Sequence, residues 1–200
     1  MQSTVQLFNT ALARLGGDQF SMNISPLEDD TVGRICKNLL PHVLDMTLAA
    51  HVWAFAVCRK ALASPVLADS SGVNPEYPHI FELPSDCVKP LHLEGFEGIN
   101  RRPSYVIEGS TIRSSIPQVV FVYVSRVTEP KLWPPMFADT LAWAMAGELA
   151  SAVNNDPQKQ ERCYQKYRIA LADAVAVDLS DQNPRPIKSE WNEARFGGGY

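Results

Sequence analysis

Short-range metal and phosphate motifs are missing from this sequence. Zinc sites need ligands at close spacing, such as CxxC or CxxxH, and no such pair occurs, so a structural zinc site is excluded. The sequence also has no GxxxxGK[ST] phosphate loop, no GxGxxG turn, no HExxH pair and no GxSxG elbow. We therefore expect neither a metal nor another cofactor.

Cysteines are few and far apart. They stand at Cys36, Cys58, Cys87 and Cys163. Three of them, all except Cys87, fall in stretches that we predict to be helical, beside apolar residues, where a free cysteine behaves as a small hydrophobe. Reduced core thiols are therefore favoured over disulfides, which fits assembly in a reducing cytoplasm.

Basic residues are outnumbered by acidic ones. The chain has 18 basic and 22 acidic residues and a formal net charge of −4. A protein whose main task is to grip nucleic acid usually carries a positive excess, so tight DNA binding is not expected. The 46% hydrophobic and 20% charged content over 200 residues is typical of a globular domain with a buried core.

No long uninterrupted apolar run occurs. The best candidate, residues 136–153, contains Asp139 and Glu148 and is rich in alanine, so it does not predict a membrane span. The first residues, MQSTVQLFNTALARLGG, lack a basic stretch followed by an apolar one, and we expect no secretory signal. We expect a soluble protein without membrane contact.

The N-terminal part of the chain predicts helices. Apolar residues at helical spacing predict a first helix that Ser3 or Thr4 caps and Gly16 ends; they are Val5, Phe8, Leu12 and Leu15. Residues 25–28, SPLE, form a capping box for a second helix. Pro41 predicts a kink or a break in that helix, which we expect to resume through residues 42–63.

The middle of the chain predicts strands. Residues 64–78 are rich in turn residues and predict an exposed connection. Two short β-prone runs surround Gly109-Ser110 within residues 104–113, which is a hairpin signal because Gly109 can adopt the positive φ of such a turn. Residues 118–127, QVVFVYVSRV, are apolar on both faces and predict a buried strand.

Helices return after the proline-rich break at residues 130–135. Residues 136–153 have only a narrow polar sector, so we expect this helix to lie deep in the core. Residues 154–157, NNDP, should end it and start another. One face of that last helix carries apolar residues (Cys163, Tyr167, Ala170, Leu171, Ala174 and Val177), and the opposite face carries Lys159, Arg162 and Lys166.

The predicted fold class is α+β, mainly α. Residues 1–64 and 131–180 should form a helical bundle. Residues 65–130 should form a loop followed by a β-rich insertion, at about residues 79–130. Residues 181–200 should form an extended C-terminal arm.

The predicted arm is polar but carries large apolar residues every four or five positions, namely Ile187, Trp191, Phe196 and Tyr200. One interpretation is a poorly ordered chain end. The favoured interpretation is an arm that docks these side chains on a partner, either a portal protein or a neighbouring subunit.

Two groups of residues invite a catalytic interpretation. His42 and Asp45 can share a helix face, but His51 is nine positions beyond His42 and points to the other side, so one continuous helix cannot gather all three. Cys87, in FELPSDCVKPL, has Lys89 to lower its pKa and Asp86 to raise it, and nothing places a histidine against the sulfur. We expect a rigid turn here, because Pro84 and Pro90 restrict the backbone on either side of Cys87. We do not expect the protein to be an enzyme.

Arg101 and Arg102 form the only adjacent basic pair in the predicted β-rich insertion. A pair of arginines can contact a phosphate backbone, and we consider it a possible DNA-channel contact. The favoured alternative is a solvated turn.

Several segments together resemble the head-to-tail adaptor, or connector, proteins of tailed bacteriophages, including the tail tubular A proteins of short-tailed phages. The resemblance covers residues 9 to 170. The segments that carry it are NTALARLGGDQ (9–19), ISPLEDDTVGRICKNLLPHVLDMTLAAHVWAFA (24–56), ELPSDCVKPL (82–91), YVIEGSTIR (105–113) and LWPPMFADTLAWAMAGELA (132–150).

The resemblance implies a structural virion protein that assembles in the host cytoplasm. Such proteins form a homo-oligomeric ring, expected here to be a dodecamer, between the portal protein and a downstream tail or nozzle protein. The ring extends the DNA channel, and DNA passes through it without specific binding. Two other hypotheses stay open: a small soluble enzyme with Cys87 at its site, and a cellular helical adaptor that binds a partner through residues 181–200.

Overall fold

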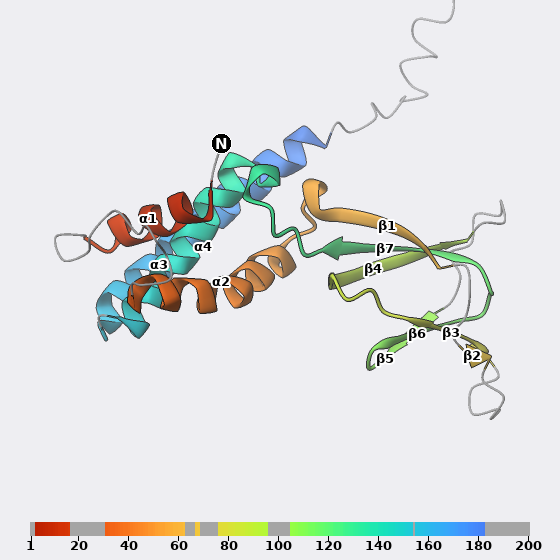
Figure 1. The fold of residues 1–200 in the computed structure, drawn as a ribbon. Coiled ribbons are helices and arrows are strands. Elements are labelled where there is room, and N and C mark those ends of the chain that lie inside the picture. Colours follow the sequence, from red (N-terminus) through yellow and green to blue (C-terminus); the bar gives the residue numbers. More distant parts are fainter. Residues whose placement is uncertain are drawn as a thin grey trace, which may run out of the picture.

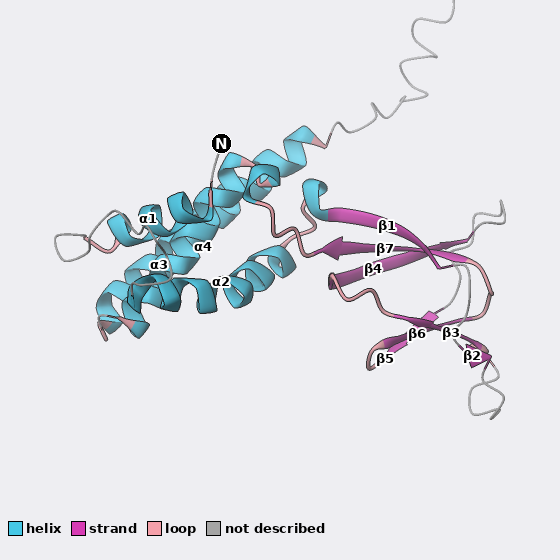
Figure 2. Ribbon diagram, in the orientation of Figure 1, coloured by secondary structure: helices cyan, strands magenta, loops and turns pink. Residues whose placement is uncertain are grey.

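The computed structural model describes residues 3–16, 31–62, 67–68, 76–95, 105–153 and 155–182. The chain has a mixed α/β fold, and its helices gather on one side of the molecule and its strands on the other (Figures 1 and 2). The described helices are α1 (Thr4–Arg14), α2 (Thr31–Ala50), α3 (Pro135–Ala152) and α4 (Pro157–Asp181). The described strands lie between α2 and α3 in the chain: β1 (Val57–Leu62), β2 (Leu67–Ala68), β3 (His79–Glu82), β4 (Cys87–Gly95), β5 (Tyr105–Glu108), β6 (Thr111–Ser114) and β7 (Val119–Ser125).

Helix α1 begins and ends as the sequence predicts. The hydroxyl of Ser3 accepts a hydrogen bond from the backbone N–H of Gln6, and Gly16 follows the helix with a φ of 84°. The buried face differs slightly from the predicted one, because Leu7 is buried where Val5 is only half-buried.

Helix α2 is not broken at Pro41, which lies inside it. The helix does end much earlier than predicted, at Ala50, and the predicted capping box at residues 25–28 lies outside the described residues. The expected helix over residues 42–63 is therefore wrong in its second half. A short 3₁₀ turn, η1 (Ala54–Ala56), leads directly into strand β1.

Strand β1 exists because it has a partner. It pairs antiparallel with β7, in a register that sets Val57 opposite Val124 and Leu62 opposite Val119. Its sequence, VCRKAL, contains residues that are good helix formers, and the ladder with β7 overrides that local preference. Cys58, expected on a helix, consequently lies on this strand.

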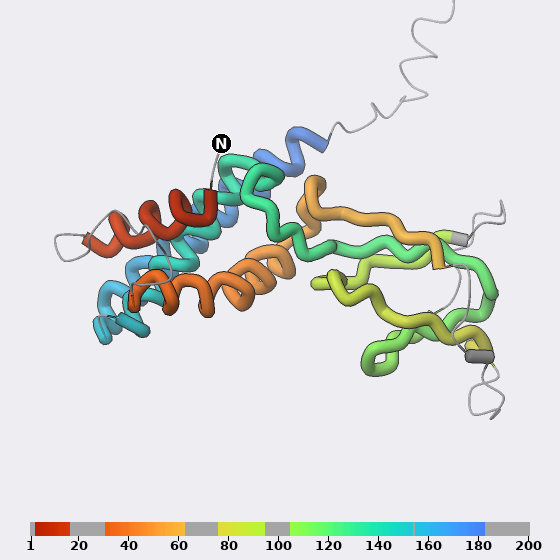
Figure 3. Tube along the Cα trace, in the orientation of Figure 1, coloured from red at the N-terminus to blue at the C-terminus, as the bar shows by residue number. Residues whose placement is uncertain are grey.

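The strands form two small antiparallel sheets. One has the order β1-β7-β4 and the other the order β2-β3-β6-β5. Strand β7 confirms the prediction for residues 118–127: it is the central strand of its sheet, and side chains on both of its faces are buried. The tube in Figure 3 shows the chain passing from the second sheet to the first twice, from β3 to β4 and from β6 to β7.

The β5–β6 hairpin is also confirmed. Glu108 and Thr111 pair across a turn of Gly109 and Ser110, and Gly109 has a φ of 60°. A residue with a Cβ is strained at this φ, which explains the glycine.

Helices α3 and α4 form the most extensive contact between helices. Helix α3 is buried around most of its surface, as predicted, and its Thr140 hydroxyl donates to the carbonyl of Ala170 on α4 at 3.1 Å. The turn between them uses Asn155 at a φ of 47°, and the Asp156 carboxylate then accepts from the backbone N–H groups of Gln158 and Lys159. None of the described helices is both long and apolar enough to cross a bilayer.

Apolar side chains form two cores. The larger core lies among the helices and includes Phe8, Leu48, Trp53, Phe137 and Leu141. The smaller core lies between the two sheets and consists of Phe81, Leu93, Ile112, Val119, Phe121 and Tyr123. Strand β7 contributes side chains to both cores. Its odd-numbered residues from 119 to 123 face the smaller core, and Val124 belongs to the larger core.

Polar side chains hold the junction between helices and strands. The Asp178 carboxylate, near the end of α4, accepts from the backbone N–H of Ala54 at 3.2 Å and lies 3.1 Å from Nε2 of His51. The Arg126 guanidinium, just after β7, donates two hydrogen bonds of 2.6 Å to Asp45 on α2. These contacts join residues more than eighty positions apart and fix the end of α2 against the start of the sheet.

Candidate functional site: a basic pocket and an exposed helix face

The residues predicted to bind partners lie outside the described part of the chain. This holds for the apolar residues of the C-terminal arm (Ile187, Trp191, Phe196 and Tyr200) and for the basic pair Arg101 and Arg102. Their roles remain predictions from the sequence.

The histidines and Asp45 do not gather into a site. His42 is exposed, Asp45 pairs with Arg126, and His51 pairs with Asp178. Within the described ranges, no group of three or more His, Cys, Asp or Glu side chains is arranged to hold a metal ion.

Cys87 begins strand β4, directly after a turn at Ser85 and Asp86. Burial of the thiol, and secondly the nearby Asp86 carboxylate, raise its pKa to about 11. The Lys89 ammonium donates to the carbonyl of Ala49 at 3.1 Å and is not among the groups that shift this pKa. The environment therefore favours the neutral thiol, which is the opposite of what a nucleophilic cysteine needs.

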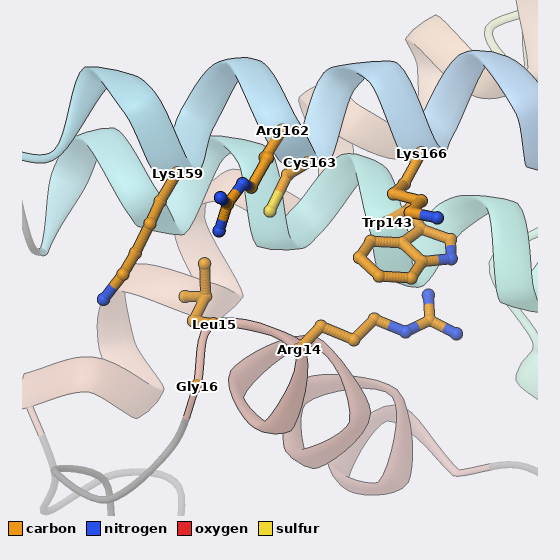
Figure 4. A pocket seen from close by; sticks show the side chains of 8 residues that line it. All are labelled: Arg14, Leu15, Gly16, Trp143, Lys159, Arg162, Cys163 and Lys166. Atoms are coloured by element: carbon orange, nitrogen blue, oxygen red, sulfur yellow. The ribbon is translucent and has the colours of Figure 1, made fainter.

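The structure contains a pocket that the sequence did not predict. It lies where α1 ends against α3 and α4 and has a volume of about 260 Å³. Its lining is mainly basic and apolar: Arg14, Leu15, Gly16, Trp143, Lys159, Arg162, Cys163 and Lys166. Figure 4 shows Lys159, Arg162 and Lys166 projecting from successive places along α4, and the Arg14 side chain reaching from α1 to the Trp143 ring.

The cations around this pocket differ in how well they are neutralised. Arg14 forms an ion pair with Asp139, and its guanidinium lies over the Trp143 ring at 4.2 Å. The Lys159 ammonium is 4.0 Å from the Asp156 carboxylate. Arg162 and Lys166 are exposed and have no ion pair or hydrogen bond with any described residue.

The base of the pocket includes the thiol of Cys163, whose residue is only 5% exposed. Burial raises the pKa of this thiol, and the positive charge of Arg14 opposes the rise. The pocket thus combines an apolar base with a rim of positive charge, in a chain whose net charge is negative.

Sequence analysis found only half of the pocket. It placed Lys159, Arg162 and Lys166 on one face of the last helix and Cys163 on the opposite face, whereas in the structure Cys163 lines the same pocket as these three cations. Arg14 and Trp143 line the pocket only because their helices, which are more than a hundred residues apart in the chain, pack together. No local sequence pattern predicts this packing.

A second feature is the outer face of α4, which we define as Ile169, Ala172, Ala176 and Leu179. These residues are spaced three, four and three positions apart, so they line one side of the helix. The buried residues Cys163, Tyr167 and Ala174 lie on the opposite side and pack against the core. Ile169 and Leu179 are 58% and 55% exposed.

Other large exposed apolar residues lie near the same end of the helices. Leu132 and Met136 stand where the chain enters α3, and Val177 stands near the end of α4. Helices α3 and α4 run antiparallel, so the start of one lies beside the end of the other (Figure 1). Exposed apolar surface that is concentrated at one end of a molecule is typical of an interaction site.

Comparisons with known proteins do not identify the chain. No protein-family model matches it, and no curated protein matches its sequence. Function must therefore be inferred from the geometry above, together with the resemblance stated in the sequence analysis.

Proposed function

We propose that this chain is a structural adaptor of a tailed-phage virion, which assembles into a ring between the portal protein and the tail. The proposed architecture is a helical bundle with a β-rich insertion and an extended C-terminal arm. Two observations support it: the described strands lie between α2 and α3 in chain order, and the segments that resemble connector proteins span both the helices and the strands.

The observation that carries the proposal is the outer face of α4. A helix with apolar residues on two opposite sides needs two partners, and within the described chain α4 has only one, on its inner side. The 3-4-3 spacing of the outer face is that of a helix packing lengthwise on another helix. Ala172 and Ala176 are small, so a second backbone can approach closely.

We assign this face to a second copy of the same chain on the basis of charge. Arg168 and Asp173 flank the outer face on opposite sides and are five residues apart. When two such helices pack in parallel, a residue on one flank faces the residue five positions later on the other helix, so Arg168 of one copy meets Asp173 of the next. Cyclic symmetry keeps a helix that runs along the ring axis parallel in every copy.

The arginine is available for this contact. Among the described residues Arg168 pairs only with Glu161, at 3.3 Å, and both side chains are more than 60% exposed. An exposed ion pair of this kind contributes little and exchanges readily for another partner.

A charge-swap experiment tests the assembly. Electron microscopy and light scattering of the purified chain should show rings, alone or on contact with a portal protein. Arg168→Asp or Asp173→Arg alone should weaken assembly, and the double variant should restore it, because the pair is then reversed. Ile169→Glu should prevent assembly, since it buries a charge in the apolar contact.

Gln158→Glu is the matched control for Ile169→Glu, because it adds the same single negative charge to the first turn of the same helix and should leave assembly intact. A chain that stays monomeric at high concentration and has no affinity for a portal would refute the proposal. If the two single charge variants assemble normally, the parallel α4 contact is wrong even if rings form.

The two alternatives make different predictions. A cysteine enzyme requires a thiolate at neutral pH, and the raised pKa of Cys87 argues against it. A cellular adaptor that binds another protein through residues 181–200 would lose its partner when that segment is deleted, and it would not respond to the paired charge reversal on α4.

A further inference from the structure

We propose that the pocket between α1, α3 and α4 binds a phosphate group. This site is independent of the assembly proposed above, because the residues that line it are not those of the outer face of α4. Its argument rests on three properties of the pocket: unpaired positive charge, an apolar base, and size.

Charge is the first property. Arg162 and Lys166 extend from adjacent turns of α4 and have no acidic partner among the described residues, while Lys159 has only a distant one. Like charges one turn apart on a helix repel one another when no counter-charge is near, and a bound anion reduces this repulsion. Two to three cations match a phosphate monoester, which carries about −1.5 to −2 charge at pH 7, better than a single carboxylate.

The preference for phosphate rests on side chains, because the Asp156 carboxylate already accepts from the backbone N–H groups at the start of α4. Lys159 is in the first turn of this helix, and Arg162 follows it by one turn. Arginine additionally offers a planar pair of donors that matches two phosphate oxygens.

The apolar base defines what the phosphate is attached to. Leu15, Cys163 and the indole of Trp143 line the pocket, and the guanidinium of Arg14 is held against that indole by its ion pair with Asp139. A volume of about 260 Å³ accommodates a small organic body in addition to the phosphate. The ligand class is therefore a phosphate carried on an apolar or aromatic group, either as a free metabolite or as part of a nucleic acid.

Isothermal titration of the full chain at low salt tests the site. The probes are inorganic phosphate, a nucleoside 5′-monophosphate, the same nucleoside without phosphate, and a short single-stranded oligonucleotide without a terminal phosphate. We expect saturable binding of the monophosphate and no binding of the bare nucleoside. Binding of the oligonucleotide alone would also support a phosphate site and would assign it to a nucleic-acid backbone.

Two double variants locate the binding. Arg162→Gln with Lys166→Gln should weaken phosphate binding by about tenfold or more, because charge-assisted hydrogen bonds are lost. Lys60→Gln with Lys131→Gln removes the same net charge from exposed positions outside the pocket and should change the affinity less than about twofold.

Both variants change exposed side chains, so circular dichroism should report an unchanged fold. The proposal is overturned if no phosphate probe gives saturable binding, or if the two double variants weaken binding equally. The second result would mean that only the overall charge of the protein matters.

Discussion

The two apolar cores of the chain show how differently helices and strands stabilise one molecule. The larger core is supplied by helices, and α3 is buried around most of its surface. The smaller core lies between two small sheets, and it depends on side chains that alternate along short strands. Packing density should therefore dominate stability on the helical side, and backbone conformation should matter more on the strand side.

The largest expected effect comes from the larger core. The Phe137 ring contacts the rings of Trp53, Phe55 and Trp133, and the residue is 1% exposed. Phe137→Ala should reduce the free energy of unfolding by about 3–5 kcal/mol. Phe121→Ala in the smaller core should cost less, because Phe121 has only Tyr123 as an aromatic neighbour in the described chain. Urea titrations of both variants would measure this, and equal losses would contradict the comparison.

The next effect concerns the junction between the two regions. Asp178→Ala leaves the N–H of Ala54 and the ring of His51 without their carboxylate acceptor, and the Asp178 side chain is only 11% exposed. We expect a loss of about 2 kcal/mol, since bonds to a buried charge are involved. Asp181→Ala, on the last residue of the same helix, should be close to neutral. Thermal unfolding of both variants measures the difference, and equal shifts in Tm would contradict a role for the junction.

Two glycine substitutions should act in opposite directions. Gly109→Ala should cost about 1 kcal/mol, because its φ of 60° strains any residue with a Cβ, although nothing lies within 4 Å of the added atom. Gly147→Ala, inside α3, should stabilise by about 0.5–1 kcal/mol, because alanine favours a helix and its Cβ would reach the Tyr164 ring only at 3.4 Å. Denaturant titrations test both, and a stabilising Gly109→Ala would show that the hairpin turn is not constrained.

The smallest effect is expected at Cys87. Cys87→Ala should preserve assembly and cost less than about 1 kcal/mol, because the side chain is only half-buried. The raised pKa means that the folded state favours the neutral thiol. The stabilisation that the neutral thiol gives to the folded state is therefore complete below about pH 9 and is lost as the pH rises through about 11. Alkylation of Cys87 should be slow at pH 7 and should accelerate up to about pH 11. Fast alkylation at neutral pH would restore the enzyme hypothesis.

Elements with strong local signals were predictable from the sequence. The cap at Ser3, the turn at Gly109 and the buried strand around Phe121 each depend on residues close together in the chain. Strand β1 was not predictable in this way. The run from residue 42 to residue 63 has no glycine and no further proline, and the end of α2 depends on Asp178, more than a hundred residues away.

Strand β4 shows a second limit. Its Pro90 predicts a rigid corner, because proline restricts its own backbone and that of the residue before it. In the structure the strand continues through Pro90, and the register with β7 shifts on either side of it. A β-bulge thus removes the conflict that the sequence suggests. The basic pocket is a case of the same kind, since Arg14 meets Trp143 only after the helices have packed.

The arrangement of the helices also has a consequence during protein synthesis. Helices α1 and α2 emerge from the ribosome first, yet their apolar sides pack against α3, which lies far along the chain; Arg14 contacts Asp139, 125 residues later. At about 5–20 residues per second, translation delays this contact by on the order of ten seconds. For that period the N-terminal helices are a binding surface for chaperones, and the pace of translation rather than the speed of folding sets how long the nascent chain is exposed.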